Sequence, residues 1–229
     1  ITDATAFATI SANGTFYGAY FSYYPSYSLF ARLILVKSYD GGATFVTHVI
    51  YTFSVSDGIP AADSLIKAGL SISCNPTDTS NLIITGTSNH YGEPDIVSYN
   101  SHDAGKTWNG PTRVNDDQVG AYDTCHDLTW GSFAANGTYG AVWRDRRNTG
   151  RGDSASFQIY GAVSTNGGDS YSPNFLVSDA VSPPVVILHG DDFLGCAVTD
   201  SGVYADWSDE RTGNEETFFN ATPFSKIPT

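Results

Sequence analysis

Histidine, aspartate and glutamate residues gather in polar segments that separate runs of apolar residues. The segment 122–127, YDTCHD, brings together Asp123, His126 and Asp127, and 89–94, NHYGEP, adds His90 and Glu93. Imidazole and carboxylate groups at this spacing could ligate a metal ion or transfer protons. An aspartate or histidine at the mouth of a strand also commonly has a structural role. These five residues are therefore candidates for ligand binding, with a structural role as the alternative.

Arginines form a second group of candidates. Arg144 and Arg146 lie in the segment 144–156, and guanidinium groups bind carboxylates through paired hydrogen bonds. A Trp-x-Asp-x-Arg pattern occurs at 143–147 and again at 207–211. A pattern that recurs indicates an Asp–Arg pair that ties a corner of the fold. Arg144 and Arg146 have no counterpart arginine in the second copy, so they are the better candidates for a ligand.

The charge balance limits the partners. The formal net charge is −13 and no apolar run approaches the length of a membrane-spanning helix. Nucleic acid and anionic membrane surfaces are excluded as partners by this charge, and we expect no membrane insertion. The sequence predicts no metal site and no cofactor. Ca²⁺ is the one cation considered, on the acidic pairs Asp116–Asp117 and Asp191–Asp192 alone.

Three cysteines offer little chemistry. Cys74, Cys125 and Cys196 have no CxxC spacing, which disfavours a zinc site built from thiolates. In a secreted protein Cys74 could pair with either of the others, and the sequence does not choose. The chain begins at Ile1 and has no Met. We expect a processed product or a portion of a longer precursor.

One motif positions all of these segments. SYDGGATF begins at Ser38, SHDAGKTW at Ser101 and STNGGDSY at Ser164, so the copies are 63 residues apart (101 − 38 and 164 − 101). Alternating apolar residues flank each copy, as expected for a hairpin around a Gly-containing turn. Two further extended runs precede each hairpin. The pattern predicts repeated units of four short antiparallel strands, A to D, with the motif at the C–D turn, which is typical of β-propeller blades.

The motif and its period resemble the Asp-box, or BNR-repeat, β-propellers of the sialidase-like superfamily. The first two copies fit the motif fully, and the third has Asn for Asp and Tyr for Trp. The residues assigned a structural role in these turns are Ser38, Asp40, Gly42, Phe45, Ser101, Asp103, Gly105, Trp108, Ser164, Asn166, Gly168 and Tyr171. We expect each box aspartate to accept hydrogen bonds from the backbone of its own turn.

The fold class implied is all-β, a single propeller portion over residues 1–229. Its blades are expected at about 1–56, 66–118, 126–180 and 192–229, and the last lacks its outer strand. Because the resemblance implies six or seven blades, we expect about four blades of a larger ring, completed by the remainder of the propeller or by another chain.

The same topology places the Asp boxes on one face and the B–C and D–A loops on the other, where this superfamily has its ligand site. The resemblance implies a secreted or cell-surface protein that binds a glycan or glycoconjugate, or a structural module. The alternative is an exo-sialidase-type glycoside hydrolase whose other catalytic groups lie in absent blades. Sequons begin at Asn13, Asn136 and Asn220, and whether they carry glycans stays open.

Overall fold

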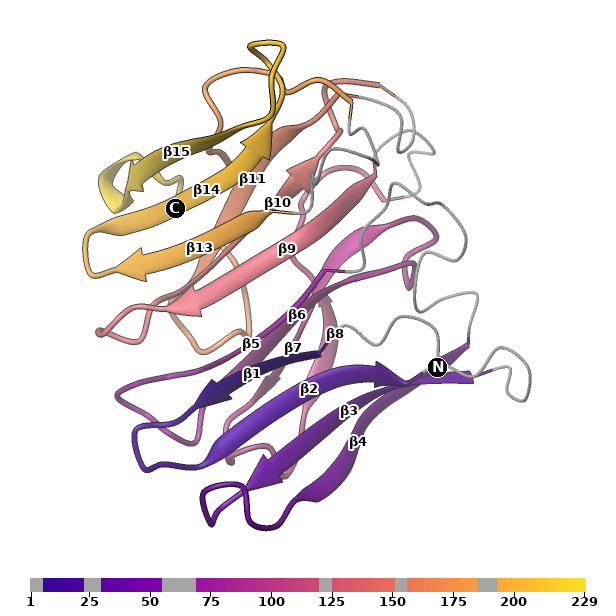
Figure 1. Cartoon of the computed structure of the whole chain (residues 1–229), viewed down its shortest axis with the longest axis vertical. Coiled ribbons are helices and arrows are strands. Elements are labelled where there is room, and N and C mark those ends of the chain that lie inside the picture. Colours follow the sequence, from indigo (N-terminus) through magenta and orange to yellow (C-terminus); the bar gives the residue numbers. More distant parts are fainter. Residues whose placement is uncertain (1–5, 23–29, 55–68, 120–124, 151–155, 185–192) are drawn as a thin grey trace.

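The computed structural model describes residues 6–22, 30–54, 69–119, 125–150, 156–184 and 193–229. These residues form four antiparallel sheets that follow one another along the chain (Figure 1). The first sheet contains β1 (Ala6–Ile10), β2 (Phe16–Ser22), β3 (Phe30–Ser38) and β4 (Val46–Ser54). The second contains β5 (Leu70–Cys74), β6 (Leu82–Ser88), β7 (Asp95–Ser101) and β8 (Asn109–Arg113).

The third and fourth sheets repeat this arrangement. The third contains β9 (His126–Phe133), β10 (Tyr139–Asp145), β11 (Gln158–Ser164) and β12 (Phe175–Leu176). The fourth contains β13 (Leu194–Thr199), β14 (Gly202–Asp209) and β15 (Glu216–Pro223), followed by the 3-10 turn η1 (Phe224–Lys226). Each strand pairs with the next in sequence, and the first strands of the sheets, β1, β5, β9 and β13, contact one another in turn. The prediction of an all-β propeller with blade-like sheets is confirmed.

Burial explains why apolar and polar residues alternate along some strands and not along others. In β3 the residues Ala31, Leu33 and Leu35 are buried against the second sheet, whereas every second residue between them is more exposed. Strands β6, β7 and β10 are buried along their whole length. They lie in the middle of sheets that are covered on both faces, so apolar or internally bonded polar residues are needed on both sides.

The Asp-box turns are closed by their own side chains. In the second box, Ser101 Oγ accepts from Gly105 N at 2.8 Å, and Asp103 Oδ1 accepts from the backbone N–H groups of Lys106 and Thr107, each at 2.9 Å. The Thr107 hydroxyl also donates to Asp103 Oδ2, at 2.6 Å. This bond contributes most to lowering the pKa of Asp103, and the backbone bonds add to it. Gly105 has a φ of +74°, and a Cβ there would lie 2.8 Å from Leu35 Cδ2, so glycine is required.

The first and third boxes have the same closure. Gly42 N donates to Ser38 Oγ at 2.8 Å and Gly168 N donates to Ser164 Oγ at 2.9 Å. Asn166 replaces the aspartate in the third box, and its Oδ1 accepts from Ser170 N at 3.1 Å. A neutral amide oxygen therefore suffices for the turn.

Adjacent boxes are also bonded to each other. The buried Lys37, which precedes Ser38, donates from Nζ to the carbonyl oxygens of Ala104 and Gly105, both at 3.1 Å. Asn100 is 63 residues further along the chain, and its Nδ2 donates to Gly167 O at 3.2 Å. The residue before the box serine thus connects each of the first two boxes to the next one.

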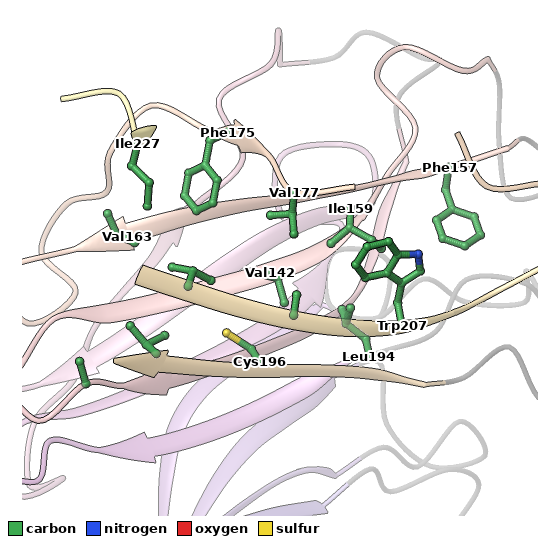
Figure 2. Packing of buried hydrophobic residues seen from close by; sticks show 14 residues of the cluster. Val142, Phe157, Ile159, Val163, Phe175, Val177, Leu194, Cys196, Trp207 and Ile227 are labelled. Carbon is green, nitrogen blue, oxygen red and sulfur yellow. The ribbon is translucent and has the colours of Figure 1, made fainter. Parts of the chain in front are cut away.

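One of two large apolar clusters joins the third and fourth sheets, and its side chains point toward one another in Figure 2. Val142 and Ile159 of the third sheet meet Leu194, Cys196 and Trp207 of the fourth. All three cysteines of the chain are described, and each is a free, buried thiol. The structure therefore contradicts the disulfide considered from the sequence. Burial raises the pKa of Cys74 to about 11 and those of the other two to about 12.

Within the described residues, no helix is long and apolar enough to cross a membrane. The connection 58–68, the sequence's one candidate for a helical turn, lies outside the described residues.

Candidate functional site on the loop face

The polar candidates lie at the ends of the strands opposite the Asp boxes. In Figure 1 the arrowheads of β9 and β13 point to the side where the tight turns lie. His126 starts β9 and Asp145 ends β10 on the other side, and the two are paired in the register. Asp95, at the start of β7, lies at the same end of the neighbouring sheet. The candidate site is therefore built from strand ends of the second and third sheets.

An irregularity in β9 sets the direction of two key side chains. The pairing of β9 with β10 shifts between Val142 and Arg144, and Leu128 has a φ of +48°, a left-handed conformation unusual for leucine. His126 and Asp127 precede this bulge as consecutive residues. His126 contacts carboxylates at the junction with the second sheet, whereas Asp127 contacts arginines on the opposite face of β10.

Asp127 is held by the two arginines predicted to bind a ligand. Arg144 donates to it from Nε at 2.9 Å and also through Nη2, and Arg146 Nη1 donates to Asp127 Oδ1 at 2.9 Å. All three residues are buried, and the Arg144 guanidinium lies 5.5 Å from the ring centre of Phe157. Arg146 Nε and Nη2 have no hydrogen-bond partner in the part of the chain that the structure describes. Two nitrogen donors of Arg146 are therefore available to a ligand.

The charge of Arg146 is stabilised despite its position. Burial opposes the charged form, but the Asp127 carboxylate outweighs this effect and raises the pKa of the guanidinium. Cys125 Sγ lies 3.7 Å from Arg146 Nη1. The pKa of the Cys125 thiol is raised to about 12, mainly by burial. The group next to Arg146 is thus a neutral thiol, and among the described residues Arg146 forms its ion pair with Asp127.

On the other face of the third sheet, His126 lies between two carboxylates. Its Nε2 is 3.3 Å from Asp117 Oδ1 and 3.2 Å from Asp145 Oδ2, and it is completely buried. These are ion-pair distances, but neither contact has the direction of a hydrogen bond. Burial alone would lower the pKa of the imidazole. The nearby carboxylates of Asp145 and Asp117 together have a larger effect in the opposite direction, so the net pKa is raised.

Asp117 belongs to a wider network with Asp95. Arg113 donates from Nε to Asp95 Oδ1 at 2.8 Å, and its Nη2 is 3.1 Å from Asp117 Oδ1. Asn115 Nδ2 donates to the same two oxygens, at 2.6 Å and 2.7 Å. One ligand atom from each of Asp95, Asp117 and His126 lies within 4.8 Å of the others. We call Asp95, Asp117 and His126 the aspartate–histidine cluster.

The two Trp-x-Asp-x-Arg patterns form corner contacts between sheets. Trp143 Nε1 donates to Asp145 Oδ2 at 2.9 Å, and Arg147 bonds both Asp145 and, at 2.7 Å, Asp116 of the preceding unit. The second copy repeats this arrangement. Trp207 Nε1 donates to Asp209 Oδ2 at 3.1 Å, Arg211 Nε donates to Asp209 at 2.7 Å, and Arg211 Nη1 reaches Asp179 at 2.5 Å.

The other predicted site residues lie in the β6–β7 loop or outside the described residues, and the charge of Glu93 contributes to the raised pKa of Cys125. His90 is exposed in the β6–β7 loop, where its ring lies 4.8 Å from that of Tyr91. Glu93 is half-buried in the same loop. Asp123 and the pair Asp191–Asp192 lie outside the described residues.

Sequence reasoning missed Asp95, Arg113 and the place of Asp145 beside His126. Asp95 and Arg113 are 18 residues apart, and no spacing rule for adjacent strands marks them. Their one signal is that a charged residue begins a strand that is otherwise apolar or weakly polar, as Asp95 does in β7.

Comparison with known proteins identifies the fold. No protein-family model and no curated protein matches the chain. Among solved structures, the chain is similar to an α-L-arabinanase of Penicillium chrysogenum, with a TM-score of 0.60 and 17% identity, over 97% of this chain and 63% of that one. It is similar to a protein of unknown function from Dyadobacter fermentans, with a TM-score of 0.58 and 14% identity, over 97% and 62%. A Trypanosoma rangeli sialidase matches with a TM-score of 0.55 and 13% identity, over 96% and 36%.

The chain is therefore an Asp-box β-propeller of the sialidase-like fold, as the sequence motif predicts. It spans less than two thirds of the length of the first two matched proteins, so its four sheets correspond to part of such a propeller. Identities of 13–17% establish the fold alone.

Proposed function

We propose that this chain is a carbohydrate-binding part of a secreted propeller, and that Arg146 binds a carboxylate of an acidic glycan. The observation that carries the proposal is the pair of unused donors on Arg146, a buried guanidinium already anchored by Asp127. A guanidinium with two parallel N–H groups fits a carboxylate in a bidentate manner. A ligand carboxylate would therefore gain two hydrogen bonds without breaking the bond to Asp127.

Two structural neighbours support a sugar as the ligand. The Penicillium arabinanase is described in complex with arabinobiose and the Trypanosoma sialidase in complex with sialic acid. Sialic acid carries a carboxylate, whereas arabinobiose does not. The donors of Arg146 favour the acidic class for this chain.

Binding of the full chain to glycans with and without a carboxylate tests the proposal. We expect Arg146→Gln to weaken binding of the acidic glycan by about 10- to 100-fold, because a hydrogen bond to a charged group contributes about 1.5–3 kcal/mol. Arg32→Gln, at an exposed position on β3, is the matched control. Equal affinities for Arg146→Gln and wild type, with unchanged melting temperatures, would contradict the proposal.

A hydrolase is the second candidate, because the arabinanase and the sialidase are glycosidases by name. Release of a fluorogenic sialoside or arabinoside by the complete protein tests this activity. We expect loss of turnover in Arg144→Ala or Arg146→Ala if the site is catalytic. Binding without any turnover would leave the glycan-binding function and eliminate the hydrolase.

The partner proposed for the chain itself is a further sheet that covers the free face of the first sheet. Phe30 and Val49 are 56% and 44% exposed on the face turned away from the second sheet. Exposed apolar side chains on one sheet face indicate a surface that is normally covered. We expect the isolated chain to self-associate in light scattering, and Phe30→Ser with Val49→Ser to reduce this. A strictly monomeric wild type would contradict the proposal.

A further inference from the structure

We propose that the aspartate–histidine cluster binds a divalent transition-metal ion such as Zn²⁺ at the junction of the second and third sheets. The ligands are one carboxylate oxygen each from Asp95 and Asp117 and a ring nitrogen of His126, and the fold brings one such atom from each residue within 4.8 Å of the others. Nε2 is the proposed nitrogen, because it lies 3.3 Å from Asp117 Oδ1. The inference is independent of the glycan-binding proposal, which concerns Arg146 on the opposite face of the third sheet.

The orientation of His126 is the first support. Its Nδ1 lies 3.2 Å from the carbonyl oxygen of Pro94, which can only accept, and 3.5 Å from Asn115 Nδ2, which can only donate. The shorter contact, to Pro94, favours the tautomer with the hydrogen on Nδ1. Nε2 then faces Asp117 Oδ1 and Asp145 Oδ2 without a hydrogen bond to either. A lone pair turned toward two carboxylates is repulsive unless a proton or a metal cation lies between them. Histidines that bind metals commonly donate the other ring N–H to a backbone carbonyl in this way.

An unpartnered carboxylate oxygen is the second support. Asp95 is completely buried, and its Oδ1 accepts from Arg113 and Asn115. Its Oδ2 is buried and has no hydrogen-bond partner among the described residues. Because an unsatisfied buried carboxylate oxygen is costly, Oδ2 is available as a ligand atom. The bonds from Arg113 and Asn115 then correspond to the outer contacts that orient ligating carboxylates.

The local charge is the third support. Four carboxylates are linked at this junction, those of Asp95, Asp117, Asp145 and, through Arg147, the half-exposed Asp116. The guanidinium groups of Arg113 and Arg147 compensate two of these charges. A proton on His126 would supply one more positive charge, whereas a divalent cation supplies two. Two negative charges of the described network remain uncompensated, and a divalent cation would balance both.

The ligand set selects the class of metal. Ca²⁺ and Mg²⁺ prefer sites made of oxygen ligands, whereas an imidazole with two carboxylates suits Zn²⁺ and neighbouring transition metals. The distance of 3.3 Å between His126 Nε2 and Asp117 Oδ1 fits this class. Two ligands at bond lengths of about 2.0–2.1 Å around a tetrahedral ion lie about 3.3 Å apart.

The experiment titrates the full chain, freed of metal with a chelator, with ZnCl₂ by calorimetry, and counts bound metal by mass spectrometry. We expect one Zn²⁺ per chain, a higher melting temperature with Zn²⁺ than with chelator, and no comparable effect of CaCl₂. Asp95→Asn and His126→Gln should weaken binding by more than about 100-fold. The control is His102→Gln, because His102 forms an exposed pair with Asp169 at 2.9 Å and should bind no metal.

The proposal is overturned if wild type shows neither stoichiometric Zn²⁺ nor a Zn²⁺-dependent melting temperature, which is the outcome expected for a protonated His126 alone. Stoichiometric Ca²⁺ in place of Zn²⁺ would also overturn it. If the cluster variants fold poorly, the wild-type titration still decides, and the visible spectrum of bound Co²⁺ reports whether nitrogen and oxygen ligands surround it. Zn²⁺ binding that is lost in His102→Gln and retained in His126→Gln would place the ion elsewhere.

Discussion

The third sheet packs against the second sheet through a largely polar junction and against the fourth through a largely apolar one. Between the third and fourth sheets, Val142, Ile159, Leu194 and Trp207 belong to one continuous apolar cluster. Between the second and third sheets, the apolar residues form two small clusters, around Trp143 and around Tyr139. The same junction also contains buried charges and hydroxyl groups, among them His126, Asp145 and the Tyr139 hydroxyl.

The corner contacts occur at both junctions, so the two junctions can be compared by what else contacts the corner aspartate. Asp145 and Asp209 each accept from a tryptophan and an arginine of their own strand end. Asp145 additionally faces the His126 imidazole, whereas Asp209 accepts from the Ser182 hydroxyl. The Ser182 arrangement shows that the corner does not require a histidine. The aspartate–histidine cluster is therefore an addition to the structural scheme, and an addition of buried charge calls for a ligand or a specific pairing partner.

The largest expected effect lies in the apolar junction. Trp207→Ala should lower the free energy of unfolding by about 3–5 kcal/mol, because a buried aromatic side chain is lost and a cavity remains. Urea unfolding measures the change. Phe219→Ala, at a side chain that is 65% exposed, is the control and should change stability by less than about 0.5 kcal/mol. Similar losses for both variants would show that this cluster does not hold the two sheets together.

The next effect compares the two corner aspartates. Asp145→Asn should cost roughly 3 kcal/mol, since it leaves Arg147 and the facing His126 with less compensation in a buried site. Asp209→Asn should cost roughly half as much, because Asp209 faces the neutral Ser182 hydroxyl where Asp145 faces His126, so less buried charge loses its partner. Chemical unfolding of the two variants under one buffer condition measures the difference. An equal cost would mean that the cluster adds nothing to the corner.

A smaller effect is expected from a single hydroxyl at the polar junction. The Tyr139 hydroxyl is buried and lies 3.2 Å from Thr85 Oγ1 across the two sheets. Tyr139→Phe should cost about 0.5–1.5 kcal/mol, the contribution of one ordinary hydrogen bond. Tyr204→Phe, at the half-buried Tyr204 of β14, is the control, and thermal unfolding compares the two. A neutral Tyr139→Phe would indicate that shape, not hydrogen bonding, matters there.

The smallest effect is a pH dependence at the apolar junction. Burial raises the pKa of Asp209, but hydrogen bonds from Arg211, Ser182 and Trp207 outweigh it, so the pKa is lowered. A carboxylate with a lowered folded-state pKa stabilises the protein above its unfolded value of about 3.9, and this contribution is lost as the pH falls through the folded value. The advantage of wild type over Asp209→Asn should therefore shrink between about pH 5 and about pH 2. A constant difference across acid titration would contradict this.

The fold was predictable because its signals are local. The box turn needs a serine, an oxygen-bearing side chain two residues later and a glycine at positive φ, all within eight residues, as at Ser101, Asp103 and Gly105. Its recurrence every 63 residues marks the length of the repeated unit, and the extended runs around each box indicate the strands. The corner contact was predictable for the same reason, since Trp207, Asp209 and Arg211 are neighbours in sequence.

The candidate site was only partly predictable, because its members meet through packing between sheets. The prediction grouped His126 with Asp127, but they are consecutive strand residues and point to opposite faces. Arg144 and Arg146 share an aspartate that sequence spacing did not assign to them. The partner of His126 at Asp117 comes from the preceding unit, and no periodic pattern encodes that contact.

The bonds from Lys37 to the second box and from Asn100 to the third have a consequence for how such a protein could grow by duplication. The first two units each carry a donor for the next unit, and the second and third carry the backbone acceptors, so a copy of the second unit brings both halves of a joint with it. The acceptors are main-chain carbonyls, which survive divergence of the side chains around them. In the third unit the corresponding residue is Val163, which packs in the apolar cluster beside Val198 and Val203. A unit inserted after the third would thus need to match an apolar surface, whereas one inserted earlier would need only a turn of the right shape.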